Sequence, residues 1–163
     1  MATRPYNTTA AAGTRFGIVG GVPATFDAAG FSALIFIDIG KIKNGGEIGK
    51  QFEIIRNNYL SQRGTEKRKG TFDAGSLTLE VDVKTDAGQA MCETALESDD
   101  DYNFQIKFKT GLTYYVRGLV TGFKKKVGGP NDMFAATITV ELNPFVDEAD
   151  VEQAALKVEP TDP

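Results

Sequence analysis

The chain has 163 residues, the length of one domain that can bury a sizeable core. Its 18 basic and 22 acidic side chains give a net charge of −4, which argues against a protein that wraps a nucleic-acid backbone. Histidine is absent and Cys92 is the single cysteine, so the sequence excludes histidine-based catalysis and an intramolecular disulfide. No apolar run approaches the roughly 20 residues of a membrane helix, and we expect no membrane anchoring.

Composition divides the chain into three parts. Residues 1–13 are small and polar, which predicts an N-terminal arm, and the Asp- and Glu-rich residues 144–163 predict an acidic C-terminal arm. Residues 14–143 lie between the arms and form the predicted β domain. Its strands are expected where β-branched and aromatic residues cluster between turns, at 14–19, 34–42, 51–59, 76–83, 102–109, 112–121 and 133–142.

The middle of this domain contains the two clearest elements. Apolar and polar residues alternate over 76–83, which predicts a strand with one buried and one solvated face. Asp86 is the predicted N-cap of a helix over about 86–98, because its carboxylate can accept from the free amides of the first turn and Gln89 occupies the third helical position. Together the elements predict a mainly β protein: an antiparallel β-sandwich or barrel with one flanking α-helix, two extended arms and a long charged loop.

Three short charged segments have no place in a hydrophobic core. Residues 61–70 carry four cations against a single acid and almost no apolar content, which predicts a protruding loop or ribbon. A triple acid follows the helix, and a triple lysine lies in the connection between the last two strands. We predict that these charges meet opposite charges on other copies of the chain, through Arg63, Glu66, Lys67, Arg68, Lys69, Lys124, Lys125, Lys126, Asp99, Asp100 and Asp101.

None of the candidate motifs predicts an enzyme or a cofactor site. The adjacent acids Asp99 to Asp101 point in different directions, whereas a hard cation needs about six to eight oxygens in a defined loop. GIVGGVP at 17–23 matches neither of the glycine motifs that bind phosphates. Cys92 has no histidine to activate it. The lysine clusters lack the interleaved aromatic residues typical of nucleic-acid binding.

Residues 63–111 resemble the major tail tube protein of long-tailed, non-contractile bacteriophages and of related prophages and gene transfer agents. The resemblance is carried by KRKG, by FDAGSLTL on the following strand and by DAGQ at the start of the helix, in that order. PATFDAAGFSAL at 23–34 and VGGPNDMFAATITVEL at 127–142 extend it to about residues 14–143.

The resemblance implies a structural protein without catalytic activity. Six subunits would form a ring, rings would stack into a tube in the virion tail, and DNA would pass through its lumen without sequence-specific binding. The loop over 57–70 would reach a neighbouring ring, and both arms would contact other subunits. The implied partners are further copies of the chain, a tape-measure protein, a tail terminator and distal tail or baseplate proteins, with assembly in the host bacterial cytoplasm.

Two other interpretations stay open at this point. One is a monomeric β-sandwich module that binds carbohydrate or protein. Such modules usually expose Trp or Tyr, whereas here Trp is absent and the five Tyr are scattered except for Tyr114 and Tyr115. The other is a related ring-forming component of a phage tail or secretion tube. The three interpretations predict different states of assembly. A tail tube protein forms stacked rings, a related ring component forms rings that do not stack, and a binding module stays monomeric.

Overall fold

The computed structural model describes residues 11–160, so residues 1–10 and 161–163 of the two predicted arms lie outside the described chain. This part of the chain is mainly β with antiparallel strand pairing, as predicted. Its helices are α1 (Ala28–Ser32) and α2 (Ala87–Leu96). Its strands are β1 (Arg15–Val19), β2 (Ile37–Ile39), β3 (Ile42–Asn44), β4 (Gln51–Asn57), β5 (Glu66–Asp73), β6 (Ser76–Asp82), β7 (Tyr102–Lys107), β8 (Thr113–Lys126), β9 (Ala135–Asn143), β10 (Phe145–Val146), β11 (Glu152–Gln153) and β12 (Leu156–Val158).

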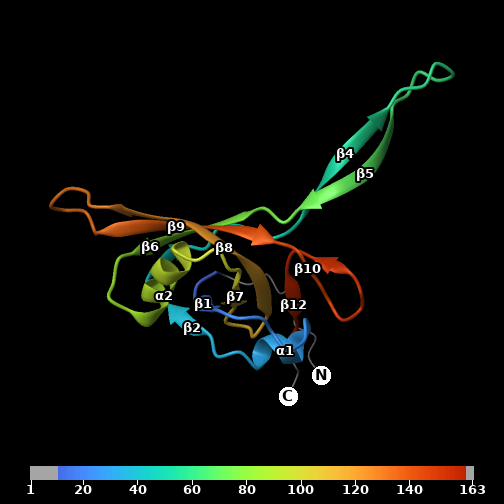
Figure 1. The fold of residues 1–163 in the computed structure, drawn as a ribbon. Helices are drawn as coiled ribbons and strands as arrows, with labels where there is room; N and C mark the ends of the chain where they lie inside the picture. The colour runs from blue at the N-terminus through green and yellow to red at the C-terminus, as the bar shows by residue number, and fades with distance from the viewer. Residues whose placement is uncertain (1–10, 161–163) are drawn as a thin grey trace, which may run out of the picture.

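The body of the molecule is one large sheet whose two ends are joined by the chain itself. Its strand order is β2-β1-β7-β8-β9-β6-β3, with β12 beside β8 (Figure 1). The two end strands, β2 and β3, are separated only by Gly40 and Lys41. Lys41 has a φ of 60°, a left-handed conformation that turns the chain sharply. The predicted strand at 34–42 is therefore two strands that pair at opposite ends of the sheet.

Alternation along β6 and β9 builds the centre of the core. Leu77 faces Val140 and Leu79 faces Ile138 across the two strands, and all four side chains are fully buried. Intervening positions such as Glu80 are exposed. This confirms the alternation predicted from the sequence at 76–83, and burial of these aliphatic side chains supplies about 1.5–3 kcal/mol each.

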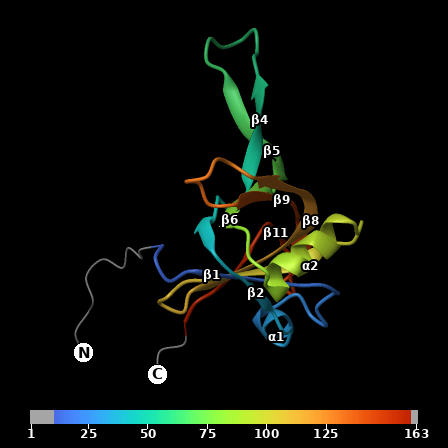
Figure 2. The same cartoon turned by 90° about the vertical axis from the view of Figure 1, so that its left-hand side faces the viewer.

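Helix α2 lies against the closed sheet at the β2–β3 corner (Figure 2). The predicted N-cap is confirmed, because Asp86 Oδ1 accepts a hydrogen bond of 2.7 Å from the amide of Gln89. Gly88 permits the close approach, since a Cβ at that position would lie 2.1 Å from the carbonyl oxygen of Asp38 in β2. Cys92 and Ala95 of the same helix are fully buried in the core.

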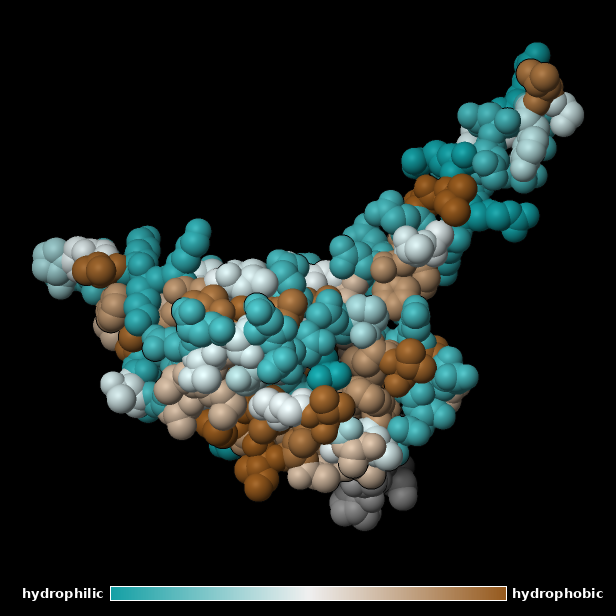
Figure 3. All heavy atoms as spheres, viewed as in Figure 1, coloured by the Kyte–Doolittle hydropathy of each residue, from teal (hydrophilic) through white to brown (hydrophobic). Residues whose placement is uncertain are grey.

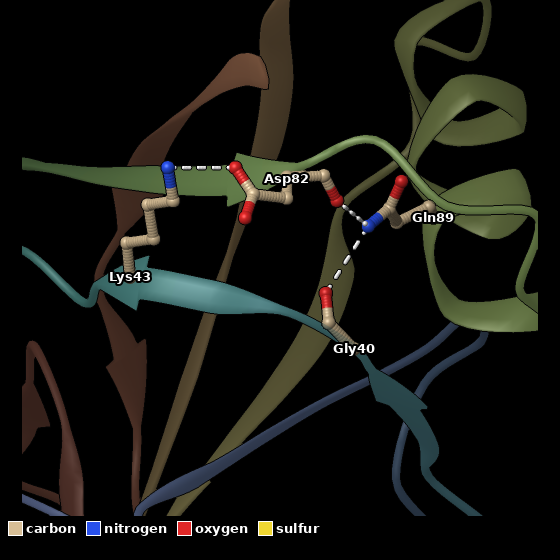
Figure 4. A network of polar contacts seen from close by, with 4 residues as sticks. All are labelled: Gly40, Lys43, Asp82 and Gln89. Carbon is tan, nitrogen blue, oxygen red and sulfur yellow. Dashed lines mark hydrogen bonds and ion pairs between the residues drawn. The ribbon is translucent and has the colours of Figure 1, made fainter. Parts of the chain in front are cut away.

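The buried side chain of Gln89 joins the helix to the corner (Figure 4). Its Nε2 donates to the carbonyl oxygens of Gly40 at 3.1 Å and Asp82 at 3.0 Å, and its Oε1 accepts from the amide of Lys84 at 3.0 Å. The Asp82 carboxylate also pairs with Lys43 Nζ at 2.7 Å. One amide side chain thus provides hydrogen-bond partners for three backbone groups, one at the β2–β3 corner and two at the end of β6.

Two segments differ from the prediction. Residues 22–33 contain α1 as a second, five-residue helix, capped by Asp27, whose side chain accepts from the amide of Gly30. Residues 145–158 form β10, β11 and β12 where the acidic composition predicts an extended arm. They fold back because Phe145 packs in a second apolar cluster with Phe31 and Tyr115, and β12 pairs with β8.

We expect Gln89→Leu to lower the free energy of unfolding of the monomeric protein by about 3 kcal/mol, because it leaves buried backbone groups unsatisfied. Urea denaturation measures the change. The matched control is Gln51→Leu, at an exposed position of β4, which should stay within about 0.5 kcal/mol of the unsubstituted protein. A loss below about 1 kcal/mol for Gln89→Leu would contradict a central role for this side chain.

Candidate assembly surfaces

The cationic segment is carried by a long hairpin that projects from the body (Figure 1; Figure 2). Its strands β4 and β5 form a separate two-stranded sheet, and over residues 11–160 they pair only with each other. In this hairpin Arg56 lies opposite Lys67 and Ile55 lies opposite Arg68. The predicted loop is therefore a ribbon in which Lys67, Arg68 and Lys69 stand on a strand with fixed spacing.

Large apolar side chains are exposed along this hairpin. Ile54, Ile55 and Tyr59 are about half exposed, at 54%, 49% and 49%, and Leu60 is fully exposed near the tip. Figure 3 shows hydrophobic spots along the hairpin and near its tip, among an otherwise hydrophilic surface. An isolated two-stranded hairpin is marginally stable in water, and grouped exposed apolar side chains mark interaction surfaces. The hairpin is therefore a candidate interaction surface.

The base of the hairpin is held by aromatic and cationic side chains. The rings of Phe52 and Phe72 meet edge to face, with centroids 5.5 Å apart. Lys69 Nζ lies 5.1 Å from the centre of the Phe52 ring, and Lys50 Nζ lies 5.0 Å from that of Phe72. These cation–π contacts stiffen the ribbon where it leaves the body. The remaining predicted residues, Arg63 and Glu66, are exposed toward its far end.

The triple lysine lies on a strand as well, where the sequence predicts a connection between strands. β8 continues to Lys126, and Lys124 and Lys126 lie opposite Thr137 and Ala135 of β9. Lys125 Nζ pairs with Glu93 Oε1 of α2 at 2.9 Å. One of the three predicted contact lysines thus has an acidic partner within its own subunit.

The triple acid forms the turn between α2 and β7. Asp101 Oδ1 accepts a hydrogen bond of 2.8 Å from the Asn143 side chain, and the amide of Asp100 donates to Ser98 Oγ at 3.2 Å. Asp99 and Asp100 are exposed. Within residues 11–160 no group of acidic or cysteine side chains is placed to hold a metal ion. The turn is a local acidic surface close to the C-terminal end of α2.

One subunit does not bring the predicted opposite charges together. The hairpin projects from one end of the body, and α2 with its acidic turn lies elsewhere on it (Figure 1). We did not predict the exposed apolar residues of the hairpin from the sequence. The sequence signal that could have identified them is the imperfect alternation in QFEIIRNNY at 51–59. Ile54 and Ile55 are adjacent there, so in a strand they point to opposite faces of the ribbon.

The perturbed ionisable groups have structural causes. Burial raises the pKa of the Cys92 thiol to about 12, with Asp86 and Glu93 adding to the shift. The amide of Gly30 lowers the pKa of Asp27, and the amide of Val151 lowers that of Asp147, in each case by stabilising the carboxylate.

Among the described residues, neither helix has the length and hydrophobicity of a membrane span.

Comparisons with known proteins identify the fold. No family model matches the sequence, and no curated protein matches it. A chain from the cryo-EM structure of the anti-feeding prophage baseplate aligns with a TM-score of 0.63 and 13% identity, covering 88% of this chain and 94% of that chain. A chain from the virion of a native gene transfer agent aligns with a TM-score of 0.53 and 14% identity, covering 64% and 82%.

A third similar structure is the sheath/tube terminator assembly of an extracellular contractile injection system. One of its chains aligns with a TM-score of 0.50 and 14% identity, covering 79% of this chain and 89% of that chain. The protein therefore has a tail tube-like fold, shared with chains of phage-tail-like particles. Because a contractile system is among them, the similarity does not single out the non-contractile phages that the sequence resembles.

We expect the free energy of unfolding to fall as the pH rises above about 9, by up to about 1.4 kcal/mol per pH unit from Cys92 alone. The unfolded thiol loses its proton near pH 8.5, whereas the folded thiol keeps it to about pH 12, so high pH favours unfolding. Urea denaturation between about pH 7 and about pH 10.5 measures the slope. Cys92→Ala should show a shallower fall, and equal slopes would contradict the buried thiol as its source.

Proposed function

We propose that this protein is a non-catalytic structural subunit of a phage-tail-like tube. Six copies form a ring, rings stack, and the hollow tube conducts DNA during ejection. The fold shared with chains of a prophage baseplate and a gene transfer agent virion supports this proposal. Its partners are further copies of itself, a tape-measure protein, a tail terminator and distal tail or baseplate proteins, in a virion tail assembled in the host bacterial cytoplasm.

The observation that carries the proposal is the unsupported β4–β5 hairpin. It combines exposed apolar side chains with a cluster of cations, and in the described chain nothing outside its own two strands pairs with it. Covering it requires another chain. If that chain is a second copy, the contact joins two different surfaces, and such contacts close into rings or continue as filaments.

The solvated face of β6 and β9 suits a DNA conduit. Thr78 lies opposite Thr139, and Glu80 lies opposite Thr137, on the side of the sheet that faces away from the core. Hydroxyl and carboxylate groups do not attract phosphates as lysine and arginine do, and the cation opposite Thr137 on this face is Lys124, near the end of β8. We place this face toward the lumen, where it lets DNA slide without holding it.

A second candidate is a ring component at one end of a tube. It is favoured by two of the similar structures, which are a prophage baseplate and a sheath/tube terminator. A subunit of this kind would form rings of the same type without stacking them.

Negative-stain electron microscopy across a concentration series, with sedimentation alongside, tests the proposal. Hollow tubes or stacked six-fold rings are the expected result. Isolated rings that never stack would favour the terminal component. Monomers at every concentration, even with initiator components added, would contradict self-assembly and favour a monomeric binding module.

We expect Lys67→Glu/Arg68→Glu/Lys69→Glu to block tube growth, because it reverses the charge of the hairpin strand that faces a neighbouring subunit. Electron microscopy and sedimentation at matched concentrations measure the effect. The control, Lys84→Glu/Lys107→Glu/Lys109→Glu, makes the same change in net charge at exposed positions on the body and should still assemble. Normal tubes from the hairpin variant would contradict the predicted contact.

A further inference from the structure

We infer that residues 145–158, which we call the C-terminal unit, set the direction in which the β4–β5 hairpin leaves the body. Lys50 is the positioning residue that joins the two. The inference concerns a single subunit, so it holds whether or not the protein forms tubes. Three features carry it: the joints at the base of the hairpin, the contacts of Lys50, and the attachment of the C-terminal unit to the body.

The first feature is a pair of glycines at the base of the hairpin. Gly49 precedes β4 with a φ of 138°, and Gly75 follows β5 with a φ of 79°. A Cβ added at Gly49 would meet no atom of the described residues within 4 Å, and one added at Gly75 would meet only the carbonyl oxygen of Gly49, at 4.0 Å. Glycine is therefore required by the backbone conformation and not by lack of space. The direction of the hairpin depends on these backbone angles.

A second joint lies farther along the hairpin. Phe52 lies opposite Phe72, whereas Ile54 lies opposite Lys69, so one residue of β4 spans two residues of β5. A bulge of this kind interrupts the ladder and increases the local twist. The hairpin therefore consists of a short aromatic base and a longer distal part that the base directs. A rotation of about 10° at the base moves a tip ~30 Å away by roughly 5 Å.

The second feature is the position of Lys50 between the hairpin and the C-terminal unit. Its Nζ lies 5.0 Å from the centre of the Phe72 ring and 5.7 Å from that of Phe52. The same Nζ donates a hydrogen bond of 3.3 Å to the carbonyl oxygen of Glu152 in β11. Figure 1 shows β10, the partner strand of β11, beside the base of the hairpin. One ammonium group thus connects the aromatic base to the backbone of the C-terminal unit.

The third feature is the attachment of the C-terminal unit to the body. The ring of Phe145 stacks on that of Phe26, with centroids 5.8 Å apart. Glu148 Oε1 accepts a hydrogen bond of 2.9 Å from the amide of Phe26, and β12 pairs with β8. The unit is therefore fixed to the body by contacts outside the hairpin, and it supplies a support against which Lys50 holds the base.

Lys50 restricts the angle of the hairpin rather than its attachment. Phe72 packs against the main core, and Ala74, next to Gly75, is buried in it. The base therefore stays attached to the body when the ammonium group is removed. What changes is the range of directions open to the distal part.

Pulsed electron paramagnetic resonance tests the inference in the full-length protein. Spin labels on Ser61→Cys near the tip and Thr85→Cys on the body, both at exposed positions, report the direction of the hairpin in a Cys92→Ala background. Sedimentation establishes a concentration at which the labelled protein is monomeric. Lys50→Met removes the ammonium group and should widen the distribution of distances at least about twofold. Lys50→Arg keeps a cation and should restore the narrow distribution.

A change in the C-terminal unit tests the coupling. Glu148→Ala removes the acceptor of the Phe26 amide, at the attachment of the unit to the body, and should also widen the distribution. The double variant Lys50→Met/Glu148→Ala should add little to the wider of the two, because both substitutions act through the same support.

The glycine joint has a matched control. Gly49→Ala should shift the mean distance by about 5 Å or more, since alanine disfavours a positive φ. Gly64→Ala, in the loop at the tip, also places a Cβ in open space among the described residues, but at a negative φ, and should leave the distances unchanged.

Thermal melting of each variant monitors folding. A folded Lys50→Met variant with the distribution of the unsubstituted protein, a folded Glu148→Ala variant without effect, or equal distances in Gly49→Ala and Gly64→Ala would overturn the inference. A protein that shows the expected distances as a monomer and never assembles would contradict the proposed function alone.

Discussion

The fold depends on the hydrogen bonds of one buried side chain at the place where the sheet closes. Between β2 and β3 the chain passes from one end of the sheet to the other, and the sharp turn at Gly40 and Lys41 interrupts the regular ladder. Gln89 hydrogen-bonds to the backbone of Gly40, Asp82 and Lys84, and so ties this turn to the end of β6. Because Gln89 belongs to α2, the same contacts hold the helix beside the sheet.

Closure of the body leaves unpaired strand edges at two places in the described chain. A closed sheet protects most of its strand edges, which otherwise pair with any exposed strand and promote aggregation. The hairpin and the C-terminal half of β8 stay open in the described chain. Because they lie apart on the body, one copy cannot satisfy both from within itself (Figure 1). The proposed association can add further chains at these unpaired edges.

In the proposed association, the placement of the cations on a strand would supply specificity. Side chains on a strand alternate between faces and repeat along each face every two residues, so the charges of β5 have a fixed pattern. A flexible loop with the same composition would offer many arrangements and lose more entropy on binding. Contacts between Lys69 and Phe52 at the base restrict the ribbon further. Electrostatic complementarity then selects the register more than it adds affinity.

Local patterns in the sequence determined the elements that depend on near neighbours. Alternation at 76–83 and the Asp86 cap predicted β6 and α2, and the polar, cationic composition of 61–70 predicted a protruding loop or ribbon. Tertiary structure alone decided the split of 34–42 and the folding back of residues 145–158, because both depend on partners distant in sequence. It also decided the Lys125–Glu93 pair. Composition reports what a segment can bury or expose, whereas the packed fold determines which distant residues it meets.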